Sequence, residues 1–237
     1  MKAVWISFKQ LLQQMASDAM LVIICFAPFL CGAVIYFGIP VIEEIVTGYF
    51  GKAEIITPYY LIFDLMMAVL ASMLFCFVSA MIVLGEIDDN ISGYMFLTPL
   101  GKRGYLISRF GIPTLMSMII TMIILSIFSL TEMSFFMIIE IAVLASIIGM
   151  LIAFMIVALA TNKVEGMAVS KLSGFLIMGA FGPFFLIGNN QYILSILPTF
   201  WMAKFAMTGS IIYMAITLFE SAFWIFVLLK LFLKKLS

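Results

Sequence analysis

Three carboxylates lie inside long apolar stretches of this chain, and they are the residues best placed to do chemistry there. They are Asp64, Glu140 and Glu220. No Lys or Arg lies deep enough in these stretches to pair with them. An acid inside a membrane is a functional candidate by default, because it must find hydrogen-bond partners or face a water-filled cavity. We therefore expect the three acids either to line a substrate pathway or to bond a neighbouring helix as structural groups.

The usual motifs of catalysis are missing from the chain. It has no histidine, no GxxxxGK[ST] phosphate loop, and no HExxH, GxSxG or GxGxxG sequence. Its three cysteines, Cys25, Cys31 and Cys76, fall in apolar runs without a CxxC pair. We expect no catalytic residue, no resident metal, no cofactor bound by this chain and no nucleotide site of its own. A net charge of zero gives no indication of a nucleic-acid partner.

The composition is that of an integral membrane protein. Of its 237 residues, 65% are hydrophobic and 10% charged, whereas a soluble domain has roughly 25% charged residues. A helix needs about 20 apolar residues to cross a bilayer, and the runs lack the alternation of a β-barrel. The sequence predicts an all-α protein with six transmembrane helices, at residues 20–39, 58–84, 105–130, 135–160, 166–188 and 209–231.

The basic residues orient these spans. Ten Lys and Arg fall on one side of the predicted spans, and only Lys52 and Lys204 fall on the other. Positive charge concentrates on the cytoplasmic side, so both termini are predicted to be cytoplasmic. Asp64 and Glu140 then lie roughly 8–9 Å below the outer surface at 1.5 Å per residue. There they could line an outer vestibule for a cationic or amphipathic substrate, while Glu220 lies near mid-span.

The segments between and beside the spans differ in kind. Residues 1–16 place apolar side chains on one helical face, which predicts a helix lying in the cytoplasmic interface. Residues 40–57 read as a short external loop. Residues 189–208 are apolar but broken by Pro198, and we expect them to dip into the outer interface or lie along it. Gly182 and Pro183 predict a kink in the fifth span, at a position suited to gating or close helix packing.

The most polar stretch, GEIDDNISGYMFLTPLGKRG, separates the second and third spans. Apolar side chains recur in it at helical spacing, and the stripe consists of Ile87, Ile91, Tyr94, Met95 and Thr98. The pattern predicts a cytoplasmic helix of about three turns, with Asp88 and Asp89 in its first turn and Pro99 after its end. So short a loop cannot bury the stripe by itself. The helix should lie on the membrane or dock into a groove of another protein.

This stretch, continued as YLISRF, resembles the intracellular signature of ABC-2 type transporter permeases. Ile87 stands where that family usually has a basic residue. The second cytoplasmic loop, TNKVEGMAVSKLSG, is similar to the family's Asn-x-x-Glu-Gly stretch before the fifth span, and the first half of the chain is most similar to the fluoroquinolone-export and lantibiotic-immunity permeases. The signature positions are occupied by Glu86, Asp88, Asp89, Gly93, Pro99, Arg103 and Arg109.

The resemblance implies a single ABC-2 type transmembrane domain over residues 1–237, in a bacterial plasma membrane. It implies that the helix between spans two and three is a coupling helix for a separate cytosolic ABC ATPase, which would bind the ATP and Mg. It also implies a second permease, either a copy of this chain or a sister chain. The implied ATPase-coupling residues are Glu86, Ile87, Asp88, Asp89, Ile91, Gly93, Tyr94, Met95, Pro99, Arg103, Lys163 and Glu165.

The function expected from the resemblance is export of an amphipathic peptide, toxin or drug-like substrate with energy from the partner's ATP. Two alternatives remain open at this point. Intramembrane carboxylates could instead serve a proton-coupled secondary transporter or a channel. The same loop could also dock a cytosolic protein onto a membrane scaffold or sensor that transports nothing.

Overall fold

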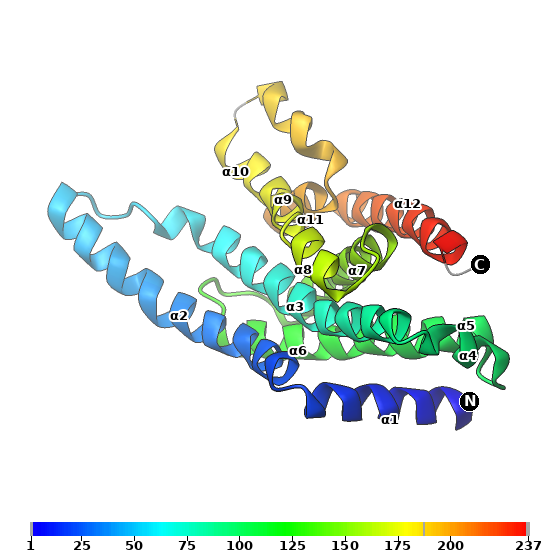
Figure 1. Ribbon diagram of the computed structural model, residues 1–237. Coiled ribbons are helices and arrows are strands. Elements are labelled where there is room, and N and C mark those ends of the chain that lie inside the picture. The colour runs from blue at the N-terminus through cyan, green and yellow to red at the C-terminus, as the bar shows by residue number, and fades with distance from the viewer. Residues whose placement is uncertain (1, 187, 236–237) are drawn as a thin grey trace.

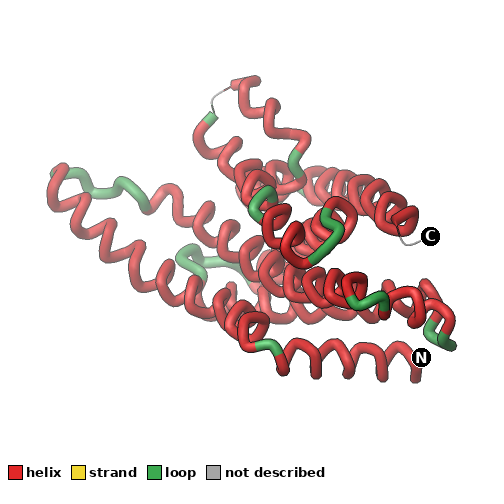
Figure 2. The backbone as a smooth tube through the Cα atoms, in the orientation of Figure 1, coloured by secondary structure: helices red, strands yellow, loops and turns green. Residues whose placement is uncertain are grey.

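The computed structural model describes residues 2–186 and 188–235, and the regular structure in this part of the chain is entirely helical (Figures 1 and 2). Six of its helical segments are long and apolar enough to cross a membrane: Ala19–Phe50, Thr57–Asp88, Gly101–Phe128, Phe135–Leu159, Lys163–Phe185 and Ile211–Lys235. The predicted all-α architecture with six spans is therefore confirmed. In chain order the elements are α1 (Lys2–Ser17), α2 (Ala19–Phe50), η1 (Thr57–Tyr59), α3 (Tyr60–Asp88), α4 (Ile91–Leu97), α5 (Gly101–Leu106), η2 (Ile107–Gly111), α6 (Ile112–Phe128), α7 (Phe135–Leu159), α8 (Lys163–Ser170), α9 (Ser173–Met178), η3 (Gly179–Phe181), α10 (Gly182–Phe185), η4 (Gly188–Ile196), α11 (Pro198–Thr208) and α12 (Ile211–Lys235).

Helices α3 and α7 form the centre of the molecule. In their most apolar windows 78% and 72% of the residues are buried, against 17% in α2 and α12. The two central helices touch backbone to backbone, since a Cβ added at Gly149 would lie 2.8 Å from the carbonyl oxygen of Ser72. Small residues at such contacts allow the van der Waals packing that holds helices together in lipid. The remaining spans surround this pair and leave broad apolar surfaces outward.

Both described ends of the chain lie at the same end of the helix bundle (Figure 1). Helices α4 and α5 lie there too, and the backbone N–H of Lys163 donates to the Asp88 carboxylate at 3.1 Å. The Lys235 ammonium donates to the carbonyl oxygens of Val157 and Ala160, where α7 stops. We call this the basic end, after the lysines and arginines of its loops, and the other the opposite end.

The first span is longer than predicted. The first part of the loop predicted at residues 40–57 is helical, because α2 continues through Pro40 to Phe50. The helix stops at Gly51, whose φ of 63° is left-handed and whose N–H bonds the carbonyl oxygen of Thr47. Glycine accepts that conformation without steric cost. The connection to the second span is therefore short, from Gly51 to Ile56.

The predicted start of the helix between spans two and three is wrong. Helix α3 continues through Ile87 to Asp88, so Asp88 and Asp89 close that helix and do not open the next one. Asn90 then adopts φ 57°, the one positive φ of a non-glycine residue in the described chain, and asparagine tolerates this better than most residues. Helix α4 begins at Ile91, has seven residues and ends before Thr98, as Pro99 predicts.

The fifth span and the segment after it are broken into short pieces. Between α9 and α10 the chain passes through the 3-10 turn η3, directly before Gly182 and Pro183. Residues 189–208, expected to dip into the outer interface or lie along it, form η4 and then α11. Most of α11 is buried against α12, α9, η3 and α7. A Cβ at Gly182 would lie 2.9 Å from the ring of Phe200, so this glycine lets α11 pack against the fifth span.

Candidate functional site

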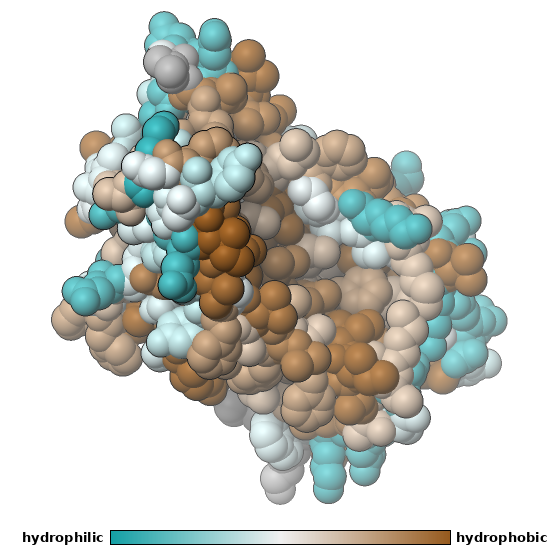
Figure 3. All heavy atoms as spheres, turned by 90° about the vertical axis from the view of Figure 1, so that its left-hand side faces the viewer, coloured by the Kyte–Doolittle hydropathy of each residue, from teal (hydrophilic) through white to brown (hydrophobic). Residues whose placement is uncertain are grey.

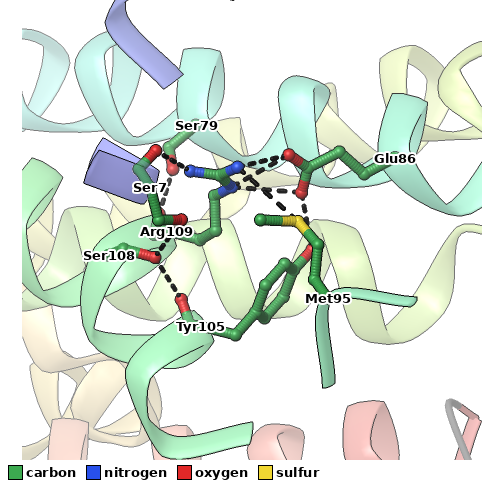
Figure 4. Close-up of polar contacts among 7 residues, drawn as sticks. All are labelled: Ser7, Ser79, Glu86, Met95, Tyr105, Ser108 and Arg109. Carbon is green, nitrogen blue, oxygen red and sulfur yellow. Dashed lines mark hydrogen bonds and ion pairs between the residues drawn. The ribbon is translucent and has the colours of Figure 1, made fainter. Parts of the chain in front are cut away.

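A buried ion pair connects the second and third spans at the basic end. Arg109 is 1% exposed and Glu86 is 3% exposed. The guanidinium donates from Nε to both carboxylate oxygens at 3.1 Å, and its NH2 group donates to Oε1 as well (Figure 4). Such fork-to-carboxylate bonds are among the strongest in proteins. Both charges are removed from solvent. Loss of either partner would therefore leave an uncompensated buried charge, which is strongly destabilising.

Groups from three further elements, two side chains and one backbone carbonyl, complete the site. The hydroxyl of Tyr105 on α5 donates to Glu86 Oε2 at 2.8 Å. Arg109 NH1 donates to the backbone carbonyl oxygen of Ser7 in α1 at 2.7 Å. Its NH2 group lies 3.9 Å from the sulfur of Met95 in α4 (Figure 4). One guanidinium thus contacts the N-terminal helix, the second span and the helix between spans two and three.

The backbone around Arg109 departs from a regular helix. Residues Ile107–Gly111 form a π-helical turn, in which the N–H of Ile112 bonds the carbonyl oxygen of Ile107. Pro113 has no N–H to give the carbonyl four residues earlier, which is that of Arg109. The hydroxyl of Ser79 on α3 donates to this carbonyl oxygen instead. Turns of this type inside α-helices are frequent at functional sites.

A groove opens beside the ion pair, between α1 and α4. It has a volume of about 570 Å³ and is lined by polar side chains of α1, by Glu86 and Arg109, and by Met95 and Leu100 on its other wall. Met95 faces the protein, but Tyr94 and Leu97 are 73% and 86% exposed. The predicted apolar stripe is thus divided, with Ile87 and Met95 packed inward and Tyr94 exposed.

The remaining predicted coupling residues lie around this site. Gly93, Pro99 and Arg103 are exposed on α4, in the turn after it and on α5. Lys163 lies across Gly85 of α3, where a Cβ would collide with its side chain. Asp89 and Lys163 both line a second, smaller groove that also contains Glu86.

Glu165 stabilises the start of α8. Its carboxylate accepts bonds from the N–H and the hydroxyl of Thr161, while the Asn162 side chain accepts the N–H of Glu165. This arrangement resembles a capping box. The structure therefore brings Glu86, Met95, Arg109 and the α8 start to one end of the molecule, and gives Glu165 a structural partner there.

At the opposite end, Asp64 holds a loop. It is fully buried, and its carboxylate accepts the N–H groups of Leu130 and Thr131 at 2.8 and 2.9 Å and the hydroxyl of Thr131. Glu43 does the same for the loop after α2, where it accepts the N–H groups of Ile55 and Ile56 at 2.8 and 2.7 Å. The structural alternative predicted for Asp64 was a bond to a neighbouring helix, whereas its partners lie in the loop between α6 and α7.

The other two intramembrane acids lack such partners. Glu140 is half-buried on α7, and its carboxylate has no hydrogen bond among residues 2–186 and 188–235. Glu220 Oε2 and the neighbouring hydroxyl of Ser221 are buried with no hydrogen-bond partner in the described part of the chain. The described residues also contain no group of three or more metal-ligating acids and cysteines.

Ser7, Tyr105 and Glu43 are among the residues of these sites that sequence reasoning missed. Ser7 contributes a backbone carbonyl oxygen, which no sequence pattern marks. Tyr105 lies at the predicted start of a span, where an aromatic hydroxyl is ordinary. Glu43 could have been found, because Glu43 and Glu44 are the only two acids in the apolar run from Ala19 to Phe50.

Comparison with known proteins identifies one family, and no curated protein and no solved structure matches the chain. The family is described as fluoroquinolones export permease protein Rv2686c-like, and the match extends over residues 12–232. It covers the first five spans, nearly all of the sixth, the ion pair and the helix between spans two and three. The chain therefore belongs to the Rv2686c-like family of fluoroquinolones export permease proteins.

Proposed function

We propose that this permease is the membrane subunit of an ATP-driven exporter, and that α4 docks a separate cytosolic ATPase. The ATPase binds the ATP and Mg, and the permease works beside a second permease chain. The observation that carries the proposal is the buried pair of Glu86 and Arg109, which ties α4 to two spans and to α1. The basic end is then the cytoplasmic one, in agreement with the positive-inside rule.

The exposed side of α4 has the chemistry of a docking surface. Ile91, Tyr94 and Leu97 are 40%, 73% and 86% exposed on a helix of seven residues. Helix-in-groove recognition uses such apolar anchors at helical spacing. Met95, on the inward side of the same helix, contacts the Arg109 guanidinium. A partner that displaces Tyr94 or Leu97 would therefore also displace Met95, which contacts the ion pair on the other side of this short helix.

The family description and one surface of the molecule support the proposed substrate class. The family description names export of fluoroquinolones. The opposite end is hollowed, with hydrophobic residues on the walls of the hollow and hydrophilic patches around it (Figure 3). Such a surface suits an amphipathic peptide, toxin or drug-like molecule leaving the cell.

The docking step is tested with a cytosolic ABC ATPase from the same organism. The two chains are co-purified in lipid nanodiscs, and ATP hydrolysis is compared with that of the ATPase alone. We expect Tyr94→Asp to abolish co-purification and stimulation, because it places a charge in an apolar contact. Tyr49→Asp is the matched control, since Tyr49 is 84% exposed at the opposite end. Normal stimulation by Tyr94→Asp would refute the proposal.

A proton-coupled transporter remains the second candidate, and the unpartnered carboxylate of Glu220 favours it. The two functions are separated in proteoliposomes by imposing a proton gradient without ATP, or ATP without a gradient. Transport that follows the gradient and ignores ATP would establish the second candidate. Transport that requires the ATPase and ATP supports the first.

A further inference from the structure

A further cavity lies away from the ion pair, between helices of the second half of the chain. It has a volume of about 330 Å³, within the range of small-molecule sites. Its walls are apolar and come from α7, α9, the junction of η4 with α11, and α12. The lining residues are Leu151, Met155, Leu159, Leu176, Ile196, Leu197, Trp224 and Leu228. Leu159 and Ile196 are 52% and 62% exposed, so the cavity opens on the apolar outer surface of the bundle.

Glu220 is not one of the lining residues, but it lies one turn before Trp224 on the same side of α12. Tyr213, Glu220 and Trp224 follow one another at spacings of seven and four, which places them on one side of a helix. Tyr213 stacks on Trp201 of α11, with ring centroids 5.8 Å apart. Trp224 lines the cavity together with Ile196 and Leu197. Glu220 therefore lies between the two contacts, one turn from Trp224.

No basic side chain of the described chain neutralises this acid. Lys204 of α11 is held elsewhere, since its ammonium bonds the Tyr192 hydroxyl at 3.1 Å and lies 4.5 Å from the centroid of the Tyr192 ring. Lys235, 15 residues after Glu220, donates to the carbonyl oxygens at the end of α7. Glu220 Oε2 and Ser221 Oγ are buried and unsatisfied. Buried polar groups without partners are costly, so a ligand that satisfies them gains binding free energy.

We propose that this cavity and Glu220 form a binding site for an amphipathic organic cation. The apolar body of the ligand lies between Trp224, Met155 and Leu197, and its ammonium or phosphonium group lies against the Glu220 carboxylate. The cation enters from the bilayer through the opening between Leu159 and Ile196. The site deepens the proposed export function, because it names the charge of the substrate, and it rests on that function for its role in transport.

The carboxylate is what distinguishes this occupant from a lipid chain. An acyl chain fills an apolar cavity equally well, but it has no group to pair with Glu220. The buried acids elsewhere in the described chain are satisfied by N–H groups or by arginine, as at Asp64 and Glu86. Glu220 has neither kind of partner, so a cationic ligand supplies what the protein lacks.

The test uses the full chain in nanodiscs of phosphatidylethanolamine and phosphatidylglycerol. Binding of radiolabelled tetraphenylphosphonium is measured at equilibrium, and empty nanodiscs are subtracted. Tetraphenylborate, of the same shape but opposite charge, is the comparison probe. We expect saturable binding of the cation, at least tenfold tighter than of the anion. Glu220→Gln should weaken cation binding about tenfold or more, as expected for the loss of a charged partner.

Two further variants keep the result interpretable. Met155→Trp should fill the cavity and weaken cation binding while leaving Glu220 in place. Glu132→Gln, the same substitution on an exposed loop, should bind the cation like the wild type. Equal binding of the two probes, undiminished binding by Glu220→Gln, or a copurified phospholipid that the cation cannot displace would each overturn the site. Because no ATPase is present, failure here leaves the docking experiment unaffected, and failure of docking leaves this binding measurable.

Discussion

The two ends of the molecule satisfy their buried carboxylates in different ways. At the basic end, Glu86 is paired with a guanidinium and a tyrosine hydroxyl of the third span. At the opposite end, Glu43 and Asp64 accept successive N–H groups of one adjacent loop each. A carboxylate that binds a loop backbone fixes local geometry. Because Arg109 also contacts α1 and α4, the ion pair makes the positions of these elements depend on one another, in keeping with the ATPase docking proposed for this end.

Breaking the ion pair should have the largest effect. Arg109→Met should lower the stability by about 3–5 kcal/mol, because it leaves the Glu86 charge buried and unpaired. The double variant Glu86→Gln with Arg109→Met should recover a large part of this loss. The measurement is the thermal midpoint of the detergent-solubilised permease. Arg103→Met, which removes an exposed arginine, should change stability by less than about 0.5 kcal/mol.

Equal stability of Arg109→Met and of the double variant would contradict the description of the basic end given above. It would mean that the guanidinium and the carboxylate act separately and that the basic end is not coupled through this pair.

Replacing Asp64 should have the next largest effect. Asp64→Asn places an amide where two backbone N–H groups require an acceptor, and we expect a loss of about 1–3 kcal/mol. Thr131→Val removes only the hydroxyl bond and should cost about 1 kcal/mol. The same thermal assay measures both. A folded Asp64→Asn variant with normal stability but lost transport would show that this acid serves the substrate pathway after all.

Glu43→Gln should act locally, because its loop connects only α2 and the second span. We expect faster amide hydrogen exchange at Ile55 and Ile56, whose N–H groups lose a charged acceptor. Exchange in α4 should not change. Increased exchange at the basic end would contradict the view that this carboxylate fixes one loop.

The smallest effect is expected from losing the hydrogen bond between the Ser79 hydroxyl and the backbone carbonyl oxygen of Arg109. Ser79→Ala removes the donor to the Arg109 carbonyl and should cost about 1 kcal/mol. Pro113→Ala would return an N–H to the position that bonds this carbonyl in a regular helix. The double variant should therefore be more stable than Ser79→Ala alone. If Pro113→Ala gives no rescue, the serine bond has another role than replacing a missing helical donor.

The gross architecture could be predicted from the sequence because hydropathy is a property of each residue. Six spans emerge from runs of apolar residues, and their number also places both termini on one side. The boundary errors have physical causes that hydropathy does not contain. Pro40 lies inside α2 and Asn90 adopts a left-handed backbone between two helices. Both outcomes depend on the local backbone and on packing with neighbouring spans.

The candidate site was predictable only in part. Glu86 and Arg109 are recognisable by their positions at the ends of two spans, but their pairing requires two helices to be aligned in depth and rotation. Arg109 also bonds the backbone carbonyl oxygen of Ser7, which lies 102 positions away in the sequence. Asp64 is a similar case, since an acid in a span looks the same in sequence whether it faces water or a loop backbone.

In the π-helical turn at Ile107–Gly111, the number of residues matters as much as their identity. Each residue of an α-helix advances the side chains by about 100° around the axis. Deleting one residue in this turn would leave six apolar spans and an unchanged hydropathy profile. It would nevertheless rotate Tyr105 away from Glu86 relative to the rest of the third span. We therefore expect homologous permeases to vary the identities of residues in this turn more freely than their number.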